Sequence, residues 1–98
     1  MPKMNGAQAL VGSLASNGVE MVFALPGVQI MDAFDAFYHE PRIRLVLAPH
    51  EQAVAYMADG YARTTGKPGV AMVVPGPGAL NATAAVGTAF ASSSPVML

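Results

Sequence analysis

Polar side chains that could exchange protons or donate hydrogen bonds gather in three short segments of the chain. Glu51 carries a carboxyl group that could act as a general acid or base, and His50 beside it could do the same. Asn81 adds a side-chain amide. Each segment also contains Pro and Gly, and apolar runs separate them: Pro26-Gly27-Val28, Pro49-His50-Glu51-Gln52, and Pro75-Gly76-Pro77-Gly78 through to Asn81.

Each of these residues could also have a purely structural role. Glu51 opens a predicted helix, where the helix macrodipole stabilises a carboxylate by about 0.3–1 kcal/mol. His50 could be a capping or core histidine, and Asn81 could donate a hydrogen bond near a helix start. The glycines could be ordinary turn residues, which is the usual role of Gly beside Pro. From the residues alone, structural and catalytic roles both remain open.

Several other chemistries are excluded by spacing. A dinucleotide-binding G-x-G-x-x-G begins at Gly76-Pro77-Gly78, but Asn81 stands where the third glycine is needed, and Pro77 lacks a backbone donor. A zinc protease would need a second histidine at Val54. The chain has neither a G-x-S-x-G nucleophile elbow nor a G-x-x-x-x-G-K-[ST] phosphate loop.

The elements that must position the three segments alternate between helix and strand. The clearest helix is 51–65, whose apolar residues recur at helical spacing before Gly66 and Pro68 end it. The spacing predicts helices at 5–17, 29–38, 51–65 and 79–91, and strands at 19–25, 43–47 and 69–74, with a fourth opening at 95–98. This order predicts an α/β fold, an open parallel sheet with helices on both faces in three layers. Ligands of such sheets bind beyond the carboxyl ends of the strands, where all three segments would lie.

Composition narrows the class of protein. Of 98 residues 53% are hydrophobic and 11% charged, so we expect other protein to cover some faces of so small a domain. The net charge is −1 with no basic stripe, which argues against nucleic-acid binding. No apolar run approaches the roughly 20 residues of a membrane span, and neither cysteine nor a signal peptide is present. We therefore expect a cytoplasmic protein that is an oligomer or part of a longer chain.

Four ordered motifs resemble one known family. They are Val22-Phe23-Ala24-Leu25-Pro26-Gly27, His50-Glu51-Gln52-Ala53, Ala58-Asp59-Gly60-Tyr61-Ala62-Arg63 and Gly76-Pro77-Gly78-Ala79-Leu80-Asn81. The set resembles the N-terminal pyrimidine-binding domain of thiamine diphosphate-dependent enzymes of the acetolactate synthase and pyruvate oxidase group. The resemblance covers essentially the whole chain, so residues 1–98 would be the N-terminal part of that domain, incomplete at the C-terminal end.

The resemblance implies a role for individual residues. Glu51 matches the glutamate that hydrogen-bonds N1′ of the cofactor's aminopyrimidine and so promotes loss of the proton from C2 of the thiazolium. Pro26, Gly27, Pro77 and Asn81 match positions that line the pyrimidine pocket. The cofactor then supplies an electron sink for decarboxylation or carboligation of a 2-oxo acid, a lyase or transferase reaction.

The resemblance also implies partners. In the family, another domain holds the diphosphate and Mg²⁺ through a Gly-Asp-Gly…Asn motif, which this chain lacks, so no metal ligand is expected here. The active site of relatives lies between two subunits, which implies a homodimer or homotetramer and an isolated chain that is inactive. Val28, Pro49, Pro75 and Leu80 depart from the usual pattern and leave the substrate open.

Two alternatives stand beside this interpretation. One is a non-catalytic α/β assembly module or a degenerate relative of the same fold, which loss of Glu51 would have favoured. The other is a flavodoxin-like domain, which would need a phosphate-binding loop of Ser, Thr and Gly where this chain has Leu25-Pro26-Gly27-Val28.

Overall fold

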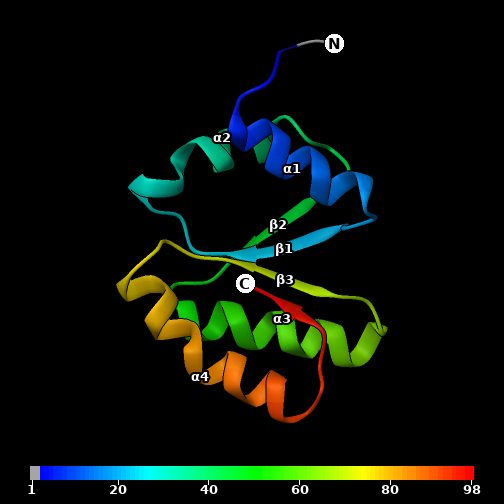
Figure 1. Ribbon diagram of the computed structural model, residues 1–98, viewed down its shortest axis with the longest axis vertical. Helices are drawn as coiled ribbons and strands as arrows, with labels where there is room; N and C mark the ends of the chain where they lie inside the picture. The colour runs from blue at the N-terminus through cyan, green and yellow to red at the C-terminus, as the bar shows by residue number, and fades with distance from the viewer. Residues whose placement is uncertain (1–2) are drawn as a thin grey trace.

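Helices and strands alternate along residues 3–98, the part of the chain that the computed structural model describes (Figure 1). The predicted α/β order is confirmed, although each strand is shorter than the apolar run that predicted it. The elements are α1 (Gly6–Ser16), β1 (Met21–Ala24), the 3₁₀ turn η1 (Val28–Ile30), α2 (Met31–Tyr38), β2 (Arg44–Leu47), α3 (Glu51–Thr65), β3 (Gly69–Met72), α4 (Pro77–Ala91) and β4 (Val96–Met97).

The four strands form one parallel sheet in the order β2-β1-β3-β4. Ala24 at the end of β1 pairs with Leu47 of β2 and with Met72 of β3, so three strands end level with one another. The open parallel sheet expected from the sequence is therefore confirmed, and its carboxyl edge is formed by the ends of β1, β2 and β3.

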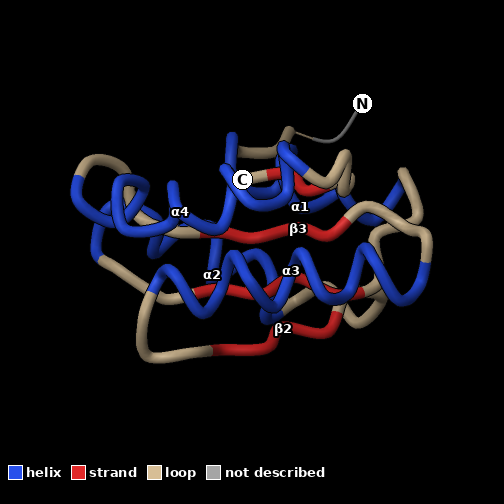
Figure 2. The backbone as a smooth tube through the Cα atoms, turned by 90° about the horizontal axis from the view of Figure 1, so that it is seen from below, coloured by secondary structure: helices blue, strands red, loops and turns tan. Residues whose placement is uncertain are grey.

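Helices cover both faces of the sheet, which gives the predicted three layers. Helices α1 and α2 lie above the strands in Figure 1, and α3 and α4 lie below them. Neighbouring residues of β1 divide between the two faces: Val22 packs with α1 and α2, whereas Phe23 packs against α3. Figure 2, seen from below, shows α3 and α4 in front of the strands.

Local capping fixes where the helices begin and end. Asn5 caps α1 as predicted, because its Oδ1 accepts from the Gln8 backbone N–H at 2.8 Å and Gln8 Oε1 accepts from the Asn5 N–H at 3.0 Å. Gly66 ends α3 with φ 73°, a left-handed conformation that Gly adopts readily. Helix α4 begins at Pro77 and not at 79 as predicted, since proline fits the first helical position without losing a needed donor.

Helix α3 lies directly against the backbone of β3. A Cβ atom at Gly69 would overlap the carbonyl oxygen of Ala58, which belongs to the middle of α3. Only a residue without a side chain allows this approach. Gly69 thereby sets the distance of α3, and of Glu51 at its start, from the sheet.

An apolar groove of about 360 Å³ runs between α1 and the strands β3 and β4. Its walls come from α1, from β3 and the residues after it, from α4 and from the last residues of the chain: Leu10, Leu14, Val70–Pro75, Ala79, Met97 and Leu98. None of the helices formed by residues 3–98 is long and apolar enough to cross a membrane.

Candidate active site

The three segments singled out in the sequence follow β1, β2 and β3 and meet at the carboxyl edge of the sheet. The strand register brings their starting points level. Within this edge Pro26 and Pro77 are exposed, Gly27 is half-buried, and Gly78 is buried. The convergence expected of a doubly wound sheet is thus present in the structure.

Glu51 is the first residue of α3 and its side chain reaches across to α4. Its Oε1 atom accepts a hydrogen bond of 3.2 Å from the Nδ2 amide of Asn81. Its own backbone N–H lowers the pKa of the Glu51 carboxyl below the ordinary value, and the Asn81 amide and the neighbouring His50 lower it further. The structure therefore shows a hydrogen bond between two of the predicted site residues, which lie 30 positions apart in the sequence.

His50 caps α3, and the capping role left open by the sequence is confirmed. Its backbone is extended, and its Nδ1 atom accepts from the backbone N–H of Gln52 at 3.0 Å. The Nδ1 nitrogen of the His50 ring is thus engaged in the hydrogen bond that caps the helix. This cap fixes the direction in which α3, and with it Glu51, leaves the sheet.

Val74 is a site residue that the sequence analysis missed. It stands between two predicted site segments: a Cβ at Gly27 would overlap its Cγ1, and a Cβ at Gly78 would lie 2.6 Å from its Cγ2. The backbone of Gly27 is extended, with φ −163°, so space and not conformation excludes a side chain there. The sequence offered one signal, a β-branched residue at the end of the predicted strand 69–74 and just before a glycine-containing turn.

We predict that Gly27→Ala lowers the free energy of unfolding by about 1–3 kcal/mol, because the added methyl group overpacks against stiff Val74. Adding Val74→Ala should recover a large part of that loss. Urea unfolding of the two single variants and the double variant of the complete protein measures the coupling. Gly12→Ala is the matched control, since a Cβ there meets no atom within 4 Å. Additive effects of the two changes would contradict the contact.

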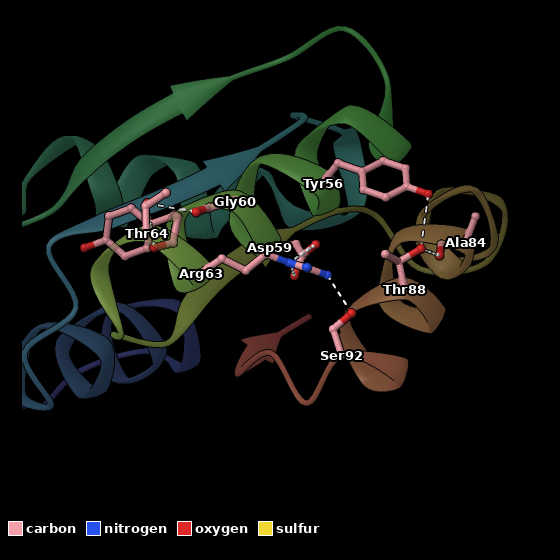
Figure 3. Close-up of polar contacts among 9 residues, drawn as sticks. Tyr56, Asp59, Gly60, Arg63, Thr64, Ala84, Thr88 and Ser92 are labelled. Atoms are coloured by element: carbon pink, nitrogen blue, oxygen red, sulfur yellow. Dashed lines mark hydrogen bonds and ion pairs between the residues drawn. The ribbon is translucent and has the colours of Figure 1, made fainter.

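A second set of polar contacts joins α3 to α4 at the other end of α3 (Figure 3). Buried Asp59 accepts from the Nε of Arg63 at 3.1 and 3.0 Å, and Nη2 of Arg63 donates to the Ser92 hydroxyl at 2.8 Å. The Arg63 guanidinium holds the pKa of Asp59 below its ordinary value. Halfway along the helix, the Tyr56 and Thr88 hydroxyl oxygens lie 3.4 Å apart. These contacts hold the two helices that carry Glu51 and Asn81 in fixed relation.

Metal ligands do not cluster in the described part of the chain. Within residues 3–98 no group of three or more His, Asp or Glu side chains is arranged to hold a metal ion. The polar groups of this edge include the Glu51 carboxylate, the Asn81 amide and the His50 imidazole, next to closely packed glycine backbone.

Comparison with known proteins points to one family. The family described as "Thiamine pyrophosphate enzyme, N-terminal TPP binding domain" matches residues 4–98. The chain is 46% identical over 98 residues to the acetolactate synthase large subunit of Haemophilus influenzae and 44% identical over 98 residues to the acetolactate synthase isozyme 3 large subunit of Escherichia coli. It is 45% identical over 95 residues, 97% of its length, to a probable 2-ketoarginine decarboxylase of Pseudomonas aeruginosa. Both synthase alignments span 100% of this chain, and all three relatives are covered over only 17% of their length.

Proposed function

The chain belongs to the N-terminal, thiamine pyrophosphate-binding domain family of thiamine pyrophosphate enzymes, and on this premise we propose that it forms the pyrimidine-binding half of an acetolactate synthase-like enzyme. Thiamine pyrophosphate is the same compound as thiamine diphosphate. Residues 1–98 would be the N-terminal part of the pyrimidine-binding domain. The proposed reaction is decarboxylation or carboligation of a 2-oxo acid.

The observation that carries this proposal is the Glu51 carboxylate at the carboxyl edge of the sheet. Its Oε1 accepts from Asn81 at 3.2 Å, while Oε2 faces Gly78, where a Cβ would come within 3.3 Å of it. The absence of a side chain at Gly78 lets Glu51 Oε2 and the Val74 methyl groups lie close to the backbone of α4. A half-buried carboxylate at this edge would fit a flat ring that presents one ring nitrogen, such as the aminopyrimidine.

Glu51 would act on the proton at N1′ of the ring, holding it in a hydrogen bond and sharing it as the ring changes tautomer. Asn81 and the loop residues Pro26, Gly27 and Pro77 would line the pocket around it. When bound, the cofactor supplies the thiazolium ring that serves as electron sink for loss of the substrate carboxyl group. The chain's own contribution is to orient the pyrimidine and to set where its proton lies.

A second protein surface would complete the site. We propose that a diphosphate-binding domain of a partner subunit holds the diphosphate and Mg²⁺, in a cytoplasmic homodimer or homotetramer, and that the isolated chain is inactive. Large apolar side chains exposed in residues 3–98 support an assembly: Val28 is 81% exposed, Leu80 is 70% exposed, and Phe90 is 87% exposed. Leu80 and Phe90 lie on α4, the helix that carries Asn81.

The test is cofactor-dependent turnover by the complete enzyme. We expect consumption of pyruvate or of another 2-oxo acid to require both thiamine diphosphate and Mg²⁺. Product analysis then separates carboligation, which joins two substrates, from simple decarboxylation. A complete protein that shows no binding of thiamine diphosphate in calorimetric titration with Mg²⁺ would overturn the proposal in favour of a non-catalytic assembly module.

A further inference from the structure

We propose that Asn81 is a positioning residue, which acts through Glu51 by holding its carboxylate with a side-chain amide and keeping it in the charged form. This role extends the expectation that Asn81 merely lines the pyrimidine pocket. The inference rests on the proposed role of Glu51, and variants at the two positions separate one from the other.

The contact is set by the packing of α3 on α4. Where the helices meet, the buried residues are alanines, since Ala55 of α3 packs with Ala82 and Ala85 of α4 and each is at most 1% exposed. Such small side chains let the helix backbones approach closely. The short side chain of Asn81 then spans the remaining gap, and its Nδ2 lies 3.2 Å from Glu51 Oε1.

The amide is a suitable group for this position because it cannot titrate. Asn81 donates a hydrogen bond at every pH, whereas a carboxylate at the same place would repel Glu51. Hydrogen bonds to a carboxylate favour its charged form, and the pKa of Glu51 is lowered first by its own backbone N–H and next by the Asn81 amide. The hydrogen bond from Asn81 would therefore shift the proton that Glu51 shares with N1′ towards the ring.

Few other charges act on Glu51. His50, next to it in the chain, is the one titratable neighbour that contributes to its pKa. The segments that meet Glu51 at this edge, 25–30, 73–76 and all of α4 (77–91), contain no ionisable side chain. A substitution at Asn81 should therefore change the ionisation of Glu51 without passing through an intermediate charge.

Asn81→Asp in the complete enzyme tests the proposal by the pH dependence of two quantities, thiamine diphosphate affinity and C2-proton exchange of the bound cofactor. A second carboxylate in place of the amide should raise the pKa of Glu51, so the acidic limb of both profiles should move up by about one pH unit or more. Asn81→Ala, which removes the donor without adding charge, should move the limb less and slow exchange about tenfold. Thr83→Ala, at an exposed position two residues after Asn81 in α4, is the matched control and should leave both profiles in place.

Each outcome has a separate meaning. If both Asn81 variants weaken binding equally at every pH and leave the midpoints unchanged, Asn81 only lines the pocket and the inference is wrong. If Glu51→Gln itself exchanges the C2 proton at the native rate, the proposed role of Glu51 fails, whatever the Asn81 variants do. A midpoint that moves upward in Asn81→Asp, together with slow exchange in Glu51→Gln, supports both.

Discussion

Glu51→Gln in the complete enzyme is expected to slow exchange of the cofactor's C2 proton by about 10²–10⁴-fold while leaving the fold intact. Glutamine has nearly the same size and can still accept a hydrogen bond, so the packing around Gly78 should survive. Its amide cannot give or take a proton at N1′ near neutral pH. The change therefore removes proton sharing and little else.

Proton exchange from labelled cofactor, followed by NMR, measures this effect without depending on the identity of the 2-oxo acid. Glu20→Gln is the matched control, because Glu20 is exposed, precedes β1 at the opposite edge of the sheet and pairs at 3.3 Å with Lys67. It should exchange at the native rate. A Glu51→Gln enzyme that binds cofactor and exchanges within a few-fold of the native rate would end the catalytic assignment.

The fold was predictable from the sequence because its main signals are local. Helix 51–65 follows from apolar spacing within one segment, and Gly66 marks its end through a backbone conformation that depends only on that residue. Alternation of helix and strand then predicts parallel pairing, which the sheet confirms. The order of the strands was not predicted, because periodicity within a segment carries no information on which strands become neighbours.

The site was predictable in location but not in its contacts. The rule that ligands bind beyond the carboxyl ends of strands is enough to place the three segments at one edge of the sheet. The hydrogen bond from Asn81 to Glu51 depends on how closely α3 packs on α4, a distance that no single segment encodes. Val74 was missed for the same reason, since its contacts to Gly27 and Gly78 join two separate turns.

The Asp59–Arg63 pair shows what a motif leaves unexplained. The Ala-Asp-Gly-Tyr-Ala-Arg stretch carried the resemblance to the family, yet the resemblance assigned its residues no function. In the structure Asp59 is only 5% exposed and is paired with Arg63. Arg63 also donates a hydrogen bond to the hydroxyl of Ser92, which directly follows α4. A buried carboxylate is stable only when it is paired or hydrogen-bonded, so the two charged residues of the motif belong together. Their spacing of four residues on one helix face could have indicated the pair.

Gly69→Ala is expected to be more destabilising than Gly27→Ala, lowering the free energy of unfolding by about 3 kcal/mol or more. The atoms that a Cβ would meet belong to the backbone of Ala58: the carbonyl oxygen, the carbonyl carbon at 2.7 Å and Cα at 3.1 Å. A side chain could rotate out of the way, but a helix backbone cannot. Helix α3 would have to move away from β3 as a unit, and Glu51 would move with it.

The displacement should therefore affect the site as well as the stability. A shift of about 1 Å in a reacting group is enough to lower a rate about 10²-fold, so C2-proton exchange should fall together with the urea midpoint. Gly12→Ala on α1 is the matched control: a Cβ there meets no atom within 4 Å, and alanine in a helix interior stabilises by about 0.5–1 kcal/mol relative to glycine. Should Gly69→Ala yield too little folded enzyme for urea unfolding, amide hydrogen exchange at β3 and α3 in the remaining soluble fraction gives the same comparison. Native-like protection of β3 and a native urea midpoint in Gly69→Ala would show that α3 does not depend on this contact for its position.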